Sequence, residues 1–159
     1  MKKLNNKWYI PVIIILLILC LVLLFVKCEH NKNEQSLPRD DSASDWSGEQ
    51  NLSKPTVDNK PAIAIPGFPD LVFESGTVKQ KVNFYNPEIN DCYFQMNLFI
   101  GYDLIWKSGN VAPGKGFYEI ELSKPLHQGE YNGDMLIKCY KQNGTELNSA
   151  RVKFKITVE

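Results

Sequence analysis

Near the start of the chain, after a short tail with three lysines, lies a block of apolar residues that is longer than a buried strand or core helix requires. From Tyr9 to Val26 no residue is charged, and at the rise of an α-helix the block spans roughly 27 Å, close to the thickness of a bilayer's hydrocarbon core. Trp8 and Tyr9 stand where interfacial aromatic residues are found. The pattern predicts a transmembrane helix over residues 8–27, in contact with membrane lipid, after a cytoplasmic tail of residues 1–7.

The charges on either side of the block predict its orientation. Three lysines and no acidic residue precede it, whereas residues 28–60 carry four basic and seven acidic residues. The positive-inside rule then places the C-terminal part outside the cell membrane, as a single-pass protein. A cleaved signal peptide would have a shorter apolar core that ends in small residues, and a lipoprotein usually has a small residue before its cysteine. An uncleaved anchor is therefore favoured, and modification of Cys20 or Cys28 stays open.

Residues 28–60 are polar and show no apolar periodicity. Such a segment buries too little surface to offset its chain entropy, which predicts a disordered linker. Trp46 is the one large aromatic residue in it. Two interpretations remain, an exposed tryptophan and a short element that docks on the folded domain.

From residue 61 onward, short runs of alternating apolar and polar residues follow one another. Period-two alternation is typical of strands with one buried and one solvated face, and turn signals such as Asn143-Gly144 separate the runs. In one run the alternation places Tyr118 on the same face as Ile120 and Leu122. The pattern predicts strands over residues 62–65, 70–74, 77–85, 92–101, 103–107, 117–123, 130–141 and 150–158.

Short strands at this spacing, with no amphipathic helix between them, predict an all-β domain over residues 61–159, an immunoglobulin-like antiparallel β-sandwich. The segment from Leu126 to Tyr131 has the Leu-x-x-Gly-x-Tyr spacing of a tyrosine corner, in which the phenol bonds back to the preceding backbone. That spacing is typical of Greek-key sandwiches and carries no information about activity.

The helix, linker and domain together resemble the uncharacterised single-pass, membrane-anchored proteins of Gram-positive bacteria that have an extracytoplasmic Ig-like domain. The resemblance covers all three parts of the chain and implies location and fold only. It is sharpest at Asn86-Pro87, Asp91-Cys92-Tyr93-Phe94, Pro113-Gly114-Lys115-Gly116, Gly129-Glu130-Tyr131 and Cys139-Tyr140.

Candidate chemistry is sparse. With 18 basic and 18 acidic residues the chain has no net charge, which argues against a nucleic-acid binder with a broad basic field. The two histidines, His30 and His127, suggest no catalytic triad, zinc spacing is absent from the domain, and Glu119 and Glu121 fit a solvated strand face. We therefore expect no enzyme activity and no cofactor, and predict a module that binds another envelope protein or a cell-wall component. The alternative is an extracytoplasmic enzyme or small-ligand sensor with an unrecognised site.

The predicted partner-binding surface is the outer face of two neighbouring strands, 92–101 and 130–141. If Phe94 and Met96 point inward, alternation turns the residues between them outward. The two strands are neighbours in an immunoglobulin-like sheet, so their outward side chains would form one aromatic patch, although ordinary surface aromatics are the competing interpretation. The candidate residues are Tyr93, Phe99, Leu136 and Tyr140.

The same two strands carry Cys92 and Cys139, both on the inward face by alternation. Because antiparallel neighbours bring the start of one strand beside the end of the other, we expect a disulfide between them. Closing a loop of about 48 residues would stabilise the domain by roughly 3–4 kcal/mol in the chain-entropy model. The competing interpretation is a pair of buried thiols that pack as small apolar groups.

Overall fold

The computed structural model describes residues 11–20, 37–48, 56–57 and 60–159. They belong to two units, Met1–Gln35 and Ser36–Glu159. In the first unit residues 11–20 form a helix with exposed side chains. No helix among the described residues is long and apolar enough to cross a membrane. Residues 8–10 and 21–27 of the predicted span lie outside the described residues, as do the predicted tail 1–7 and much of the predicted linker, so the anchor stays a prediction.

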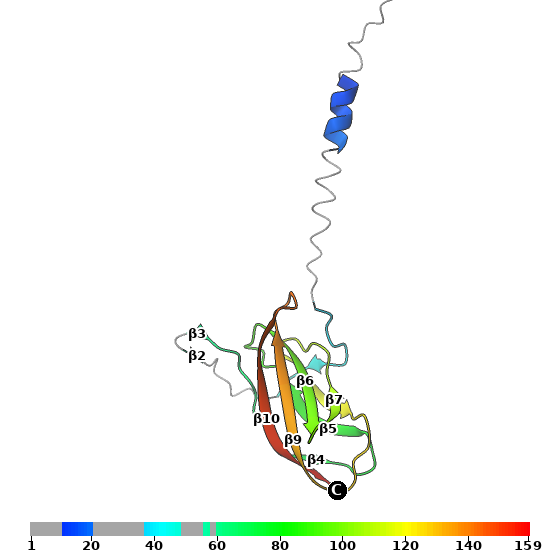
Figure 1. Cartoon of the computed structure of the whole chain (residues 1–159), viewed down its shortest axis with the longest axis vertical. Helices are drawn as coiled ribbons and strands as arrows, with labels where there is room; N and C mark the ends of the chain where they lie inside the picture. Colours follow the sequence, from blue (N-terminus) through cyan, green and yellow to red (C-terminus); the bar gives the residue numbers. More distant parts are fainter. Residues whose placement is uncertain (1–10, 21–36, 49–55, 58–59) are drawn as a thin grey trace, which may run out of the picture. The chain divides into compact units, whose positions relative to one another are not determined.

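The second unit is mostly β-structure, arranged in sheets of five, three and two strands (Figure 1). Neighbouring strands are antiparallel throughout, except that β4 runs parallel to β10. The five-stranded sheet has the order β4 (Leu71–Phe73), β10 (Glu146–Val158), β9 (Gly129–Tyr140), β6 (Tyr93–Ile100), β7 (Asp103–Lys107). The three-stranded sheet has the order β1 (Ser44–Asp45), β8 (Lys115–Glu121), β5 (Lys79–Tyr85), and the small sheet pairs β2 (Thr56–Val57) with β3 (Lys60–Pro61).

Two expectations from alternation are wrong in detail. Residues 62–65 form no strand, because the backbone of Ala64 bonds a side chain, accepting from and donating to the amide of Asn90. Tyr118 is 46% exposed although Ile120 and Leu122 are buried. The register between β5 and β8 shifts between Lys81 and Phe84, and such an irregularity breaks strict alternation. The other seven predicted strands correspond to β4 through β10.

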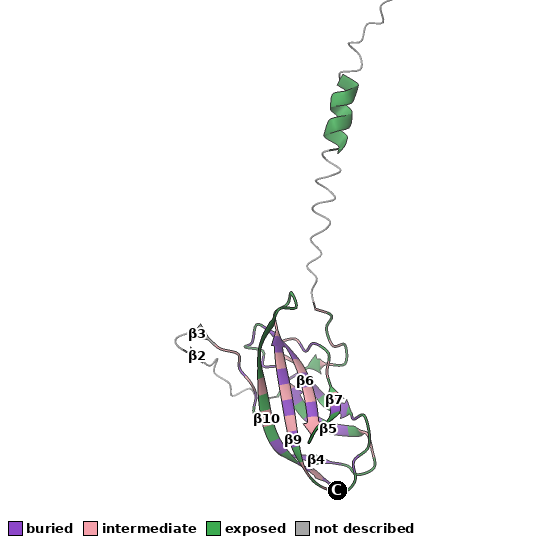
Figure 2. Ribbon diagram, viewed as in Figure 1, coloured by how far each residue is buried: buried purple, intermediate pink, exposed green. Residues whose placement is uncertain are grey.

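The core lies between the two larger sheets, which makes the unit a two-layer β-sandwich. Buried and half-buried residues alternate along β6 and β9 (Figure 2). Phe84 of β5 is fully buried and packs on Trp106 of β7 and Phe154 of β10, with ring centroids 5.8 and 6.3 Å apart. Gly133 makes room for this packing, since a Cβ there would lie 2.7 Å from the Phe154 ring.

Two buried asparagines join the loops at one end of the sandwich. The side-chain amide of Asn86 donates to the carbonyl oxygens of Cys92 and Val111, at 2.8 and 2.9 Å. Asn90 donates to the side-chain oxygen of Asn86 and to Ala64 O, both at 2.9 Å. The Asn86 backbone adds bonds to Gly114 and Lys115. Because a buried polar group is tolerated only when it is hydrogen-bonded, this network fixes the relative positions of three loops.

We predict that Asn86→Ala lowers the free energy of unfolding by about 2–4 kcal/mol, because two buried carbonyl groups lose their donor. Urea unfolding of the full chain in detergent micelles measures the loss. Asn97→Ala is the matched control, since its amide makes one long contact of 3.5 Å to Leu136 O, and it should cost less than about 0.5 kcal/mol. Equal losses in the two variants would contradict a special role for Asn86.

Candidate functional site

Strand register places the four predicted surface residues on one face of the five-stranded sheet. Tyr93 pairs with Tyr140, and Phe99 pairs with Asp134, next to the Asn97–Leu136 pair. We call this the outer face: the side of β6 and β9 that is turned away from the three-stranded sheet. The intervening pair, Gln95 with Lys138, divides the predicted aromatic patch into two parts.

At one end of the outer face, Tyr93 is only 8% exposed although it points away from the core. Residues from the N-terminal side of the domain are bonded to this end of the sheet. Leu37 N donates to Gln142 O at 3.0 Å, and the side chain of Asn110 donates to Pro38 O at 2.7 Å. The chain therefore crosses from the turn after β9 to the loop after β7, past the Tyr93–Tyr140 pair. Tyr93 is not an available contact residue, contrary to the prediction.

The middle of the outer face combines apolar and charged groups. Phe99 and Leu136 are half-buried. The guanidinium of Arg151, which pairs with Leu136 across β9 and β10, lies 5.8 Å from the centre of the Phe99 ring and bonds Asp134 at 2.7 Å. Aromatic residues and arginine are enriched in protein interfaces, and here one of each lies together beside Leu136.

Residues 37–48, here called the strap, pack on the sandwich. Trp46 is 8% exposed and stacks on Tyr85, with ring centroids 3.8 Å apart, while its indole N–H donates to the side chain of Asn83 at 2.6 Å. Burial raises the pKa of Tyr85. Gly116 permits this approach, since a Cβ there would lie 3.0 Å from the indole and 2.5 Å from Phe84 O. Trp46 is thus a docking element, the second of the two interpretations.

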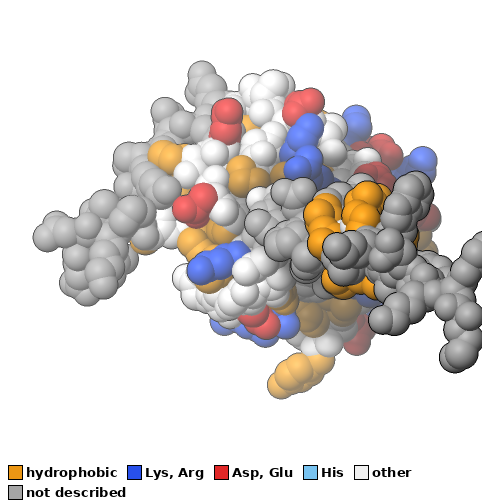
Figure 3. Space-filling view, turned by 90° about the horizontal axis from the view of Figure 1, so that it is seen from above, with side chains coloured by type: hydrophobic (Ala, Val, Ile, Leu, Met, Phe, Trp, Pro, Cys, Tyr) orange, Lys and Arg blue, Asp and Glu red, His pale blue; other side chains and the backbone are white. Residues whose placement is uncertain are grey.

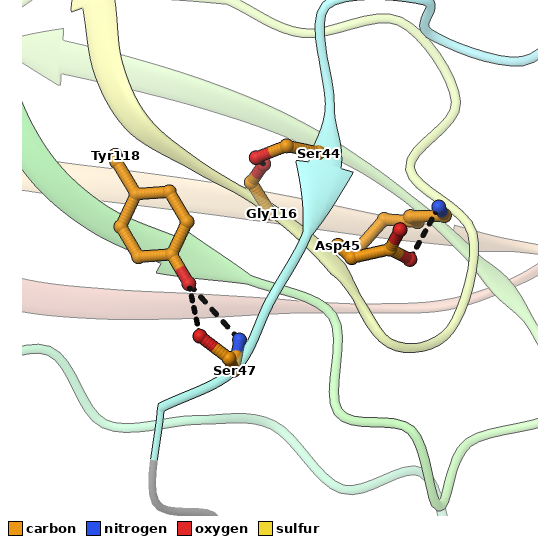
Figure 4. A network of polar contacts seen from close by, with 6 residues as sticks. Ser44, Asp45, Ser47, Gly116 and Tyr118 are labelled. Carbon is orange, nitrogen blue, oxygen red and sulfur yellow. Dashed lines mark hydrogen bonds and ion pairs between the residues drawn. The ribbon is translucent and has the colours of Figure 1, made fainter.

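Polar contacts hold the strap along β8 (Figure 4). Ser44 pairs with Gly116 and Asp45 pairs with Lys115, whose ammonium also bonds the Asp45 carboxylate. Ser47 N donates to the Tyr118 hydroxyl at 2.9 Å, and the hydrogen bonds from Ser47 lower the pKa of Tyr118. The compact unit accordingly begins at Ser36 rather than at residue 61, so part of the predicted linker belongs to the folded domain.

A groove of about 590 Å³ lies between β7 and β8. Its lining is apolar at Leu104, Ile105, Trp106, Phe117 and Ile120. At one end Ser123, two residues after β8, donates its backbone N–H to the carbonyl oxygen of Ile105, the middle residue of β7, at 2.8 Å. At the other end Asp40 and Ser42 of the strap line the groove. The remaining lining residues are Lys79, Lys107, Glu119, Glu121 and Ser123.

Groups suited to catalysis or metal binding are dispersed in the described part of the chain. No set of three or more His, Cys, Asp or Glu side chains there is arranged to hold a metal ion. His127 lines a cavity of about 290 Å³ with Asp103, Lys124 and Tyr131. Its carbonyl oxygen accepts a hydrogen bond from the Tyr131 hydroxyl at 2.9 Å, which confirms the contact expected of a tyrosine corner. Acidic and basic side chains are interspersed on the face drawn in Figure 3.

The structure brings Cys92 and Cys139 together as reduced, buried thiols. Cys139 pairs with Phe94, so Cys92 lies diagonally across the strand pair, just before β6. The hydrogen bond between the two cysteines, aided by burial, raises the pKa of the Cys139 thiol above its ordinary value. Since the thiolate is the reactive form, the raised pKa disfavours attack by Cys139 in the folded domain.

We predict that chains isolated from cells without a reductant contain the disulfide expected between Cys92 and Cys139. After unfolding and alkylation without a reductant, mass spectrometry should find neither Cys92 nor Cys139 labelled, and reduction should expose both. Cys92→Ala is the control, because it leaves Cys139 without its partner and therefore open to labelling. Full labelling of both cysteines in the unreduced protein would refute the bond.

The sequence pattern predicted neither the strap nor the groove. Trp46, as a possible docking element, was the one residue that pointed to the strap. The sequence matches no protein-family model, and it has no significant match among curated proteins or solved structures. What this protein does must therefore be inferred from its own residues and their geometry.

Proposed function

We propose that this protein is a membrane-anchored, extracytoplasmic binding module without catalytic activity, whose Ig-like domain contacts another envelope protein or a cell-wall component. Its proposed contact surface is the middle of the outer face, formed by Phe99, Leu136 and Arg151. No metal or cofactor is part of the proposal.

Sequence supports the location. The uncharged block from Tyr9 to Val26 is long enough to span a bilayer as a helix, and lysines precede it without an acidic residue. An N-terminus in the cytoplasm would place the unit Ser36–Glu159 on the outer side. A binding domain held there meets its partner in a two-dimensional layer, where effective concentrations are high.

Strand order supports the Ig-like part of the proposal. In immunoglobulin domains one sheet contains strands G, F and C as neighbours, and the other contains B and E, flanked by D. Here β10, β9 and β6 are neighbours in one sheet, and β5 and β8 are neighbours in the other. On this comparison β1, next to β8, stands in the position of strand D, and β7 in that of strand C′.

The observation that carries the binding proposal is the cluster of Phe99, Leu136 and Arg151. Arginine and aromatic residues contribute most to interface free energies, and half-buried apolar groups lose their remaining water when a partner covers them. The Asp134 carboxylate holds Arg151 in place, so the side chain is already ordered before binding, which lowers the entropic cost.

We predict that a photo-crosslinking residue at Asn97, between Phe99 and Leu136, forms a discrete adduct with one envelope component in intact cells. The same residue at Lys81, exposed on β5 of the other sheet, is the positional control and should form none. Adding Leu136→Ser should reduce the Asn97 adduct about tenfold, the loss expected when one buried aliphatic contact is removed. Val72→Ser, at an exposed apolar residue of β4, should leave it unchanged. Equal adducts from Asn97 and Lys81 would exclude the outer face.

We predict that protease added to intact cells removes the unit Ser36–Glu159 and leaves the N-terminal tail protected, because the positive-inside rule retains Lys2, Lys3 and Lys7 in the cytoplasm. Epitope tags at the two ends of the chain, followed by immunoblotting before and after cell lysis, measure this directly. A domain that becomes accessible only after lysis would reverse the proposed orientation.

A further inference from the structure

β8 is paired along one side only for most of its length. β5 pairs with one edge of it, and on the opposite edge β1 pairs with Gly116 and Lys115 alone. In the described part of the chain no strand pairs with residues 117–121 on that edge. Unpaired backbone groups on a strand edge are a template for a further strand.

β7 presents a second edge to the same space, with no strand paired to it in the described part of the chain but with Ile105 O bonded by Ser123 N. It pairs only with β6 among the described strands, and its other side borders the groove. The bond between Ser123 and Ile105 closes one end, and the strap closes the other. Five residues of a strand extend roughly 16 Å, so the free part of β8 offers a site for a segment of about that length.

The floor of the groove suits apolar side chains. Trp106 and Phe117 meet edge to face across it, with ring centroids 5.1 Å apart. Leu104 on β7 is 42% exposed, although it lies beside these rings in the groove lining. The charged side chains at the rim include both signs, and Lys79 and Glu119 lie 4.0 Å apart. An added strand would thus place every second side chain on apolar surface and the others toward the polar rim.

We propose that the groove takes an extended segment of a partner protein, about five residues long, with apolar side chains at alternate positions, which adds to β8 as an antiparallel strand. The chain's own β1 shows that this edge accepts a strand in that direction. β1 cannot continue along β8, because Asp40 N donates to Asn110 O at 2.9 Å and the Asp40 carboxylate accepts from Ser42 and Gly109, which turns the strap toward the other sheet. This site is separate from the outer face and does not depend on it.

The probes are two soluble seven-residue peptides in which valine alternates with threonine, one ending in lysines and one in glutamates. With the full chain in detergent micelles, hydrogen exchange read by mass spectrometry should show that at least one peptide slows exchange in residues 117–121 about tenfold. An analogue methylated on the backbone nitrogens has the same side chains but lacks donors for the edge, and it should give no protection.

Leu104→Glu should weaken binding of that peptide at least about tenfold, since a charge then meets its apolar side chains. Val72→Glu, which places the same charge on the edge strand β4, is the matched control and should not. The proposal is wrong if neither peptide protects residues 117–121 at about 1 mM, or if the methylated analogue binds equally well. Protection of residues 117–121 in the absence of peptide would also overturn the proposal. If that protection is lost when the protein is diluted, the occupant is a second copy of the chain. If it persists on dilution, the occupant is another segment of the same chain.

Discussion

The structure depends on one buried amide, that of Asn86. Its side chain satisfies two carbonyl groups in different loops, and its backbone binds Gly114 and Lys115. The loop held in this way supplies Gly114 O, which accepts from Trp46 N, and Asn110, which binds the strap at Pro38 and Asp40. Asn86 therefore determines the position of the strap, and with it one end of the groove, although its side chain bonds neither the strap nor a residue that lines the groove. A buried amide without its partners would cost more than the bonds contribute, so the arrangement is specific.

The two candidate surfaces differ in the kind of recognition that they permit. The outer face presents side chains of fully paired central strands, so a partner there would be selected by the shape and chemistry of Phe99, Leu136 and Arg151. The groove presents backbone edges, so hydrogen bonding to the main chain would supply affinity with little regard to sequence. The strap reaches both, since it crosses the end of the outer face and pairs with β8.

Alternation along the chain was sufficient to predict seven strands, because it follows from period-two burial. The pairing of β6 with β9, and with it the closeness of the two cysteines, was predicted from the strand order of immunoglobulin-like sheets. Three features needed information that pattern does not contain. Tyr93 is buried at an end of the sheet where the strap, more than 50 residues earlier in the chain, bonds Gln142 and Asn110. Tyr118 is turned outward by a shift on the neighbouring strand. The strap itself is polar, and only Trp46 distinguishes it from a linker, since its pairing depends on the tertiary position of β8.

The order of the strap contacts along the chain has a mechanical consequence. Tension applied at the N-terminal end of the compact unit would reach Leu37 first, then Asp40, then the β1 pairs and finally Trp46. These bonds would break in succession rather than together, so the strap would peel at low force while the two-layer core stayed intact. Release of about 12 residues would lengthen the connection by roughly 40 Å. The strap would thus act as a short segment that can extend under load between the two-layer core and the point where the N-terminal end of the unit is attached.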